Sequence, residues 1–178
     1  MIIAIDPGSE ESGYVVMNDN LSIIEKGKIT NEELLVELHV YLDNYRLSYD
    51  KKLKDELHIA IEMIASYGMA VGKEVFDKCV WIGRFIEVAN GYRNKPTLIY
   101  RREEKMNLCG SMNAKDSNIV QALIDRFAYG VPNKGKGNKK EPGWFYGFAK
   151  DIWQAYAVGV TFHDKYLVTE KANKIYSK

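Results

Sequence analysis

Two short apolar segments of this chain each end in a carboxylate. Residues 2–6 read IIAID and residues 58–62 read HIAIE. Both are short and rich in β-branched residues, which predicts two buried strands. A Pro-Gly pair follows the first strand and turns the chain away sharply. If the two strands are parallel neighbours, about 4.8 Å apart, the side chains of Asp6 and Glu62 converge at one edge of a sheet.

Two like charges at that distance repel each other unless a cation lies between them. Asp151, at the start of the last predicted helix, is the best candidate for a third carboxylate, and Gln154 lies one turn later on the same face. Carboxylate oxygens suit Mg²⁺, with Mn²⁺ as a substitute. The pattern therefore predicts a metal site held by Asp6, Glu62 and Asp151. The alternatives are a turn cap for Asp6 and a helix-dipole contact for Asp151.

The periodicity along the rest of the chain predicts an α/β fold. Strands are expected at residues 1–6, 13–18, 21–29, 57–62 and 96–100, and helices at 30–46, 73–90, 115–130 and 149–163. Thr30 and Glu33 form a capping box at the first helix. Three antiparallel strands followed by helix–strand alternation predict a mixed five-stranded sheet, its last two strands parallel, with helices on both faces.

Length and composition bound the class of protein. A chain of 178 residues with 46% hydrophobic and 28% charged residues is typical of one soluble domain, expected at 1–166 with a tail at 167–178. No segment predicts a membrane span or a signal peptide. Cys79 and Cys109 are too few and too far apart for a zinc cluster or disulfide framework, which favours the cytoplasm of a bacterium or a phage-infected host.

The charge is distributed unevenly along the chain. Residues 1–89 carry 9 basic against 16 acidic side chains, a net of −7, whereas residues 90–178 carry 16 against 8, a net of +8. A basic second half favours a polyanionic partner. Within it, residues 130–143 contain four glycines, two prolines and four lysines. That composition predicts an exposed, mobile loop whose lysines can follow phosphates.

The ordered motifs resemble those of the RuvC-type Holliday-junction resolvases. The matching segments are IIAIDPGSEESGYVV, HIAIEM, NAKDSNIVQALIDRF and KDIWQAYAVGV, which span about residues 1–165. The resemblance looks strongest to the RuvC-like proteins of phages and prophages. It implies an RNase H-like fold, a homodimer, and Mg²⁺-dependent cutting of branched DNA such as four-way junctions by a two-metal mechanism.

The same resemblance assigns roles to individual residues. It implies catalytic roles for Asp6, Glu62, Asp151, Gln154 and Lys115. Gln154 departs from the aspartate usual in the family, which puts the fourth metal ligand in doubt. Expected DNA contacts come from Lys115, Arg101, Arg102, Tyr67, Lys134, Lys136, Lys139 and Lys140.

Other functions are compatible with parts of the pattern. The first motif also resembles the phosphate loop of actin-like kinases, but those proteins need two such domains and a longer chain. RNase H-fold nucleases of ribosomal RNA processing are shorter and do not fit the Lys-rich insertion at 130–143. A junction-binding protein that does not cleave is the third alternative, with Gln154 as the sign of lost catalysis.

Overall fold

A computed structural model describes residues 1–47, 56–66, 68 and 70–169 of the chain. The predicted contact of Tyr67 and the end of the tail, 170–178, lie outside the described residues. One sheet contains the strands β1 (Ile2–Asp6), β2 (Glu11–Met17), β3 (Ile23–Thr30), β4 (His58–Met63) and β5 (Thr97–Tyr100). The helices are α1 (Asn31–Leu47), α2 (Lys73–Gly91), α3 (Arg101–Cys109), α4 (Asp116–Phe127) and α5 (Lys150–Phe162), with a 3-10 turn η1 (Asn133–Gly135) and a π-helical extension η2 (His163–Val168).

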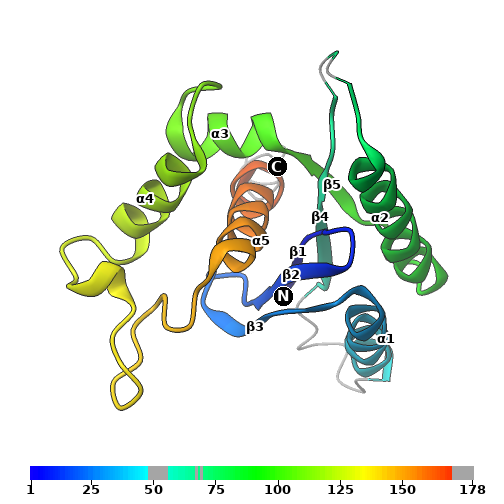
Figure 1. Cartoon of the computed structure of the whole chain (residues 1–178). Helices are drawn as coiled ribbons and strands as arrows, with labels where there is room; N and C mark the ends of the chain where they lie inside the picture. The colour runs from blue at the N-terminus through cyan, green and yellow to red at the C-terminus, as the bar shows by residue number, and fades with distance from the viewer. Residues whose placement is uncertain (48–55, 67, 69, 170–178) are drawn as a thin grey trace, which may run out of the picture.

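The sheet has the strand order β3-β2-β1-β4-β5. β1 pairs with β2 and β2 with β3 in antiparallel fashion, whereas β1–β4 and β4–β5 are parallel. The predicted mixed sheet and the parallel placement of β4 beside β1 are thus confirmed. These pairings bring the ends of β1 and β4, 57 positions apart in the chain, to the same end of the sheet (Figure 1).

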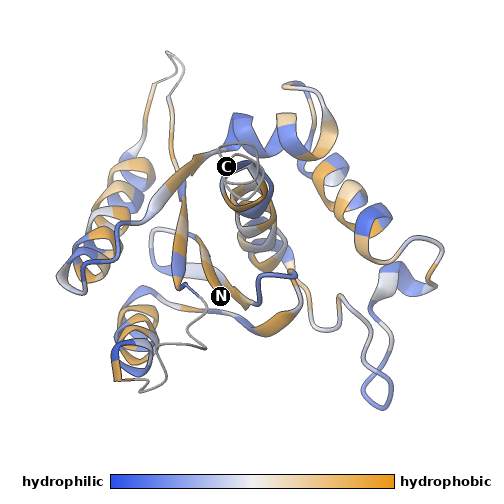
Figure 2. Ribbon diagram, turned by 180° about the vertical axis from the view of Figure 1, so that it is seen from behind, coloured by the Kyte–Doolittle hydropathy of each residue, from blue (hydrophilic) through white to orange (hydrophobic). Residues whose placement is uncertain are grey.

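Alternation along the strands divides the core into two layers. Ile2, Ala4 and Ala60 face α5, which lies across the sheet together with α3 and α4 on one side. Ile3, Ile5, Ile59 and Ile61 face α1 and α2 on the other side. Both layers are apolar because the central strands are covered on both faces. In Figure 2 the helices on both sides of the sheet alternate between hydrophobic and hydrophilic residues along their ribbons.

The first helix begins as its sequence predicts. The Thr30 N–H donates to Glu33 Oε2 at 3.0 Å, and the Glu33 N–H donates to Thr30 Oγ1 at 3.3 Å, which confirms the capping box. The helix α2 also occupies nearly its predicted range. Two of its apolar residues, Phe76 and Val80, are nevertheless 60% and 62% exposed.

The helix α3 is absent from the sequence-based prediction. It follows β5 directly, and the Glu103 side chain accepts a hydrogen bond from the Tyr100 N–H at its start. Its buried residue is Glu104, a charged one, so apolar periodicity could not reveal the helix. The helix α4 is shorter than predicted, ending at Phe127. Near the C-terminus, η2 continues through Val168. The boundary expected between the domain and its tail, at residue 167, therefore falls inside a helical segment.

The Lys-rich segment 130–143 has more internal structure than its composition predicts. Gly137 and Pro142 form an isolated antiparallel bridge, and the Gly143 N–H donates to the Lys136 carbonyl at 3.0 Å. Gly135 is buried, with φ +71°, and a Cβ there would lie 2.4 Å from the Ala128 Cβ. The segment is a looped extension beside α4, seen at the lower left of Figure 1.

A buried polar pair holds the turn that follows Asp6. Ser12 and Asn31 are both completely buried, and the Ser12 hydroxyl donates to Asn31 Oδ1 at 2.5 Å. The Gly8 N–H donates to Ser12 Oγ, while Asn31 Nδ2 donates to the Gly8 carbonyl, each at 3.2 Å. Because buried polar groups need their partners, this network ties the turn to β2 and to the start of α1.

Asn31→Leu should lower the free energy of unfolding by about 1–3 kcal/mol, because it removes the acceptor of the buried Ser12 hydroxyl and the donor to the Gly8 carbonyl. Chemical denaturation measures the change. Asn44→Leu is the matched control, since Asn44 is an exposed residue of the same helix. Equal effects of the two substitutions would contradict the role assigned to the network.

Candidate functional site

The side chains of Asp6 and Glu62 lie side by side on the face of the sheet that α5 covers. Ala4 pairs with Ala60 in the β1–β4 register, so Asp6 and Glu62 follow two residues later on the same face. Their carboxyl groups share a hydrogen bond. Burial, then this bond and the charge of Glu62, raise the pKa of Asp6 to about 9, while Lys78 acts in the opposite direction.

Asp151 approaches Asp6 because one glycine leaves room for it. Gly13 is the cross-strand partner of Asp6 on β2. A Cβ on Gly13 would lie 2.5 Å from the carbonyl oxygen of Asp151 and 2.9 Å from its Cβ, too close for any side chain. The first turn of α5 therefore rests directly on β2. Asp6 and Asp151 line one cavity of about 290 Å³, and the charge of Asp151 also contributes to raising the pKa of Asp6.

Gln154 lies one turn beyond Asp151 on α5. Its Oε1 atom is buried and has no hydrogen-bond partner in the structure. A buried amide oxygen without a partner costs free energy, so a ligand at this position would relieve it. This oxygen is of the type that hard cations accept, like the nearby carboxylates.

Two cationic side chains contact the acidic residues. Lys28 Nζ lies 3.0 Å from Asp151 Oδ2 and 2.9 Å from Glu11 Oε2, and these hydrogen bonds raise its pKa. Lys28 is the cross-strand partner of Gly13 on β3, so it belongs to the same row across the sheet. On the other side, Arg101 Nη1 lies 3.9 Å from Glu62 Oε1. Neither contact was predicted from the sequence.

The donor set fits a divalent cation in its chemistry. The adjacent carboxyl groups of Asp6 and Glu62, the first with a raised pKa, would gain from a bound cation. As the side chains lie, however, no three His, Cys, Asp or Glu residues within the described ranges are grouped closely enough to hold one. Asp151 and Glu62 instead face Lys28 and Arg101. Metal binding would therefore replace the contacts of Asp151 with Lys28 and of Glu62 with Arg101, and the ligand roles of Asp6, Glu62 and Asp151 stay predictions.

Two further charged residues, Lys78 of α2 and Glu104 of α3, belong to the surroundings of the acidic site. Sequence reasoning missed both. Lys78 lines both the cavity at Asp6 and a second one, of about 310 Å³, at Glu62. Glu104 is completely buried and contacts Arg101. Burial and then the charge of Glu62 raise its pKa, whereas Arg101 opposes the shift. Neither residue could be found from its sequence neighbours, because only the packing of the helices against the sheet edge brings them here.

The remaining candidates do not line the cavities at Asp6 and Glu62. Lys115 is exposed at the start of α4, next to Asp116, which binds Arg101 at 2.6 Å. Arg102 is exposed and lies over the Tyr100 ring. In the Lys-rich segment, Lys134, Lys139 and Lys140 are exposed. Lys136 is not free to follow a phosphate backbone, because its Nζ donates to the Phe148 carbonyl at 3.0 Å.

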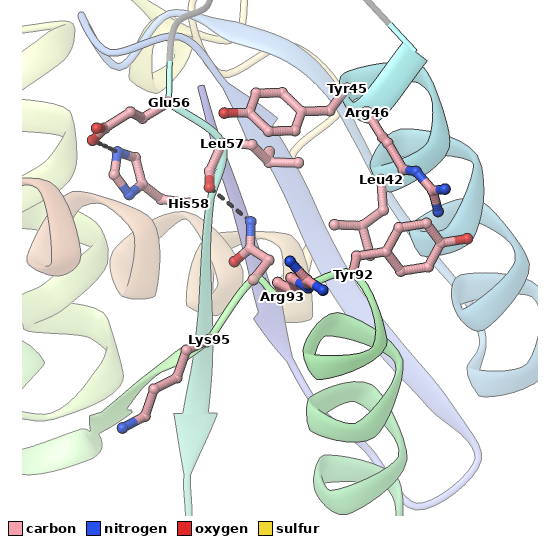
Figure 3. Close-up of a pocket in the computed structure, with 10 residues that line it drawn as sticks. Leu42, Tyr45, Arg46, Glu56, Leu57, His58, Tyr92, Arg93 and Lys95 are labelled. Atoms are coloured by element: carbon pink, nitrogen blue, oxygen red, sulfur yellow. Dashed lines mark hydrogen bonds and ion pairs between the residues drawn. The ribbon is translucent and has the colours of Figure 1, made fainter.

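A separate cavity of about 450 Å³ lies at the opposite end of β4 (Figure 3). It contains basic side chains, among them Arg46, Arg93 and Lys95. Asn94 donates to the Leu57 carbonyl at 2.8 Å there, and His58 faces Glu56. His58 begins β4 whereas Glu62 lies near its end, so this cavity is not part of the carboxylate site.

The described residues also contain no helix long and apolar enough to cross a membrane.

Asp6→Asn should stabilise the protein without divalent cations. A pKa raised from 3.8 to about 9 means that the folded protein holds a proton that the unfolded chain releases. Stability is therefore lost as the pH rises between these values. In EDTA at pH 8 the variant should gain about 1–3 kcal/mol, and Mg²⁺ should stabilise wild type more than the variant. Denaturation at pH 5, 7 and 8.5 measures this; Glu87→Gln, at an exposed position, is the control. Parallel pH curves for wild type and variant would contradict it.

Comparison with known proteins identifies the fold. A scan of protein-family models finds no match, and no curated protein matches the sequence. The solved structures that match include Thermus thermophilus RuvC, and T. thermophilus RuvC in complex with a Holliday junction substrate. Each has a TM-score of 0.55 and 14% identity and covers 90% of this chain, and 91% and 90% of the respective RuvC chains. The similarity to phage proteins stays a prediction. The chain thus has the RNase H-like fold in the form found in RuvC.

Proposed function

We propose that this protein is a metal-dependent endonuclease that cuts branched DNA and resolves Holliday junctions by hydrolysing phosphodiester bonds. The observation that carries the proposal is the meeting of Asp6, Glu62 and Asp151 at one sheet edge of a RuvC-type fold. One of the matching RuvC structures is a complex with a Holliday junction substrate. The basic second half of the chain is suited to the same polyanion.

In this proposal the carboxylates act as ligands of Mg²⁺ or Mn²⁺. A bound divalent ion supplies an activated water and stabilises the charge on the attacking and leaving oxygens of a phosphodiester. Asp6 is the central ligand, because it contacts Glu62 and shares a cavity with Asp151. Gln154 contributes its buried, unpaired amide oxygen toward the same site or a water in it. Lys115 acts near the cut phosphate from the start of α4.

Lys28 and Arg101, which neutralise the carboxylates in this structure, have a second role in the proposal. Lys28 and Arg101 balance Asp151 and Glu62 as long as no cation is bound. With a cation bound there, Lys28 would become available to a DNA phosphate, whereas Arg101 would lose only its contact with Glu62 and keep those with Glu104 and Asp116. A homodimer would place two such sites on one four-way junction, as symmetric cutting of two strands requires. The proposed compartment is the cytoplasm.

The first test is cleavage of a synthetic four-way junction, compared with linear duplex of the same sequence, with and without Mg²⁺. Wild type should cut the junction only with the metal. Asp6→Asn and Glu62→Gln should each lose cleavage by at least about a thousandfold. Both variants should bind the junction as tightly or more tightly than wild type, since a negative charge near phosphates is removed.

Two further variants serve as controls for this test. Glu87→Gln removes an exposed carboxylate of α2 outside the site and should cleave normally. Gln154→Asp should remain active, with an altered dependence on metal concentration. Junction binding by a wild-type protein that never cleaves would favour the non-cleaving alternative, for which Gln154 is the supporting observation. Retained cleavage by Asp6→Asn or Glu62→Gln would exclude the metal mechanism.

The Lys-rich segment should contribute to affinity rather than to chemistry. Replacing Lys134, Lys139 and Lys140 together with alanine should reduce the slope of log affinity against log salt by about 0.9 for each phosphate that is no longer neutralised. Lys136 is kept, because it bonds to the Phe148 carbonyl. The three positions are exposed, so stability should fall by less than about 1 kcal/mol.

The measurement is junction affinity at several salt concentrations, with single-turnover cleavage at saturating protein as a second readout. Lys95→Ala, at the opposite end of the sheet, is the control. The cleavage rate at saturation should not change in the triple variant. An unchanged salt slope would mean that DNA does not touch this segment.

A further inference from the structure

Glu104 is a buried ionisable residue that the proposed metal chemistry does not use. It lies in the first turn of α3, directly after β5, and none of its surface is exposed. Its Oε2 accepts a hydrogen bond from Arg101 Nη1 at 2.5 Å, whereas its Oε1 is buried without a partner. A buried carboxylate with an unpaired oxygen costs free energy. Its presence calls for an explanation beyond packing.

Glu104 is the fixed partner of Arg101. The guanidinium contacts three carboxylates: Glu104 at 2.5 Å, Asp116 at 2.6 Å and Glu62 at 3.9 Å. The Asp116 side chain is 70% exposed, so solvent screens its attraction, whereas Glu104 is shielded from water. Removing either member of a buried pair leaves the other uncompensated. The position of Arg101 beside Glu62 therefore depends mainly on Glu104.

Arg101 has capacity left for a further ligand. A guanidinium carries more N–H donors than the bonds to Glu104 and Asp116 use, and its planar fork matches the oxygens of a phosphate. The Arg101 side chain is 23% exposed and lines the cavity of about 310 Å³ at Glu62. Burial lowers the pKa of Arg101, but the neighbouring carboxylates outweigh that effect, so it keeps its charge.

A second cation faces the same cavity. Lys78 of α2 lines it together with Glu62 and Arg101, and its charge also acts on Asp6. Glu74, one turn before Lys78, is an exposed carboxylate of the same lining, and solvent weakens its repulsion of an anion. Two cations from different helices thus converge on a hollow next to the carboxylates. Such an arrangement is suited to one phosphate group.

We propose that Glu104 is a positioning residue, which holds Arg101 so that Arg101 and Lys78 bind one phosphate of the DNA strand beside Glu62. This inference rests on the proposed function. Two possible roles of Glu104 predict opposite effects of its removal on junction binding. A role of Glu104 as a bare negative charge near DNA predicts that its removal strengthens junction binding. Positioning predicts the opposite sign.

The experiment measures binding of a four-way DNA junction in EDTA, at several salt concentrations, so that no cleavage occurs. Arg101→Gln and Lys78→Ala should each weaken binding by about tenfold and reduce the salt slope by about 0.9. Glu104→Gln preserves size and removes the charge. It should also weaken binding by several-fold, despite the gain in net positive charge. Arg84→Gln, an exposed α2 residue over the Trp81 ring, is the matched control and should bind normally.

A double-mutant cycle tests whether Glu104 acts through Arg101. Glu104→Gln combined with Arg101→Gln should bind no more weakly than Arg101→Gln alone, because the charge to be positioned is already gone. Independent, additive losses would overturn the inference. So would binding by Glu104→Gln that equals or exceeds that of wild type.

Two further measurements distinguish a failure of this inference from a folding defect of the variant and from a failure of the proposed function. If Glu104→Gln does not fold, as judged by thermal unfolding, Arg101→Lys with Glu104 intact decides. This variant keeps the charge but not the fork, and should lose several-fold in affinity; full affinity would overturn the inference. Wild-type protein that binds no junction overturns both proposals. Wild type that binds and cleaves, with Glu104→Gln unimpaired, overturns only this one.

Discussion

The register between β1 and its two neighbours is the constraint on which the rest of the site depends. In one row across the sheet, Lys28 is opposite Gly13, Gly13 is opposite Asp6, and Glu62 follows in register on β4. Side chains alternate with a period of two, so a slip by one residue would turn Asp6 into the α1–α2 layer. The apolar residues that precede each carboxylate prevent such a slip, because they must face the two cores.

The absence of a side chain at Gly13 lets the first turn of α5 pack directly onto this row of residues. Any Cβ there would collide with the backbone of Asp151, so the start of α5 can lie this close to β2 only because position 13 is a glycine. Asp151 thereby lines the same cavity as Asp6, which lies beside Glu62, and the repulsion between these carboxylates must be balanced. In the structure, Lys28 and Arg101 provide that balance, and protonation of Asp6 is favoured by its raised pKa. A proton on Asp6, the side chains of Lys28 and Arg101 and a divalent cation would thus be alternative ways to balance the same negative charge.

The two sides of the acidic group differ in how firmly their cations are held. Lys28 reaches its partners from an exposed strand, so water screens its ion pairs. Arg101, in contrast, is anchored by the buried Glu104 at the start of α3. An anchored guanidinium loses little freedom when a ligand arrives, because its orientation is already set. Such an arrangement is better suited to placing a phosphate than to attracting DNA from a distance.

Local pattern determined a large part of this protein. The apolar runs ending in Asp6 and Glu62, the capping box of Thr30 and the order of strands and helices were sufficient for the mixed sheet. They also placed both carboxylates at its edge. Only the tertiary structure revealed α3, Glu104, Lys28 and Lys78 as parts of the same region. The physical reason is that periodicity records burial of apolar groups. A charged residue buried by an ion pair, or a lysine brought near by strand pairing, has no such signature in the sequence.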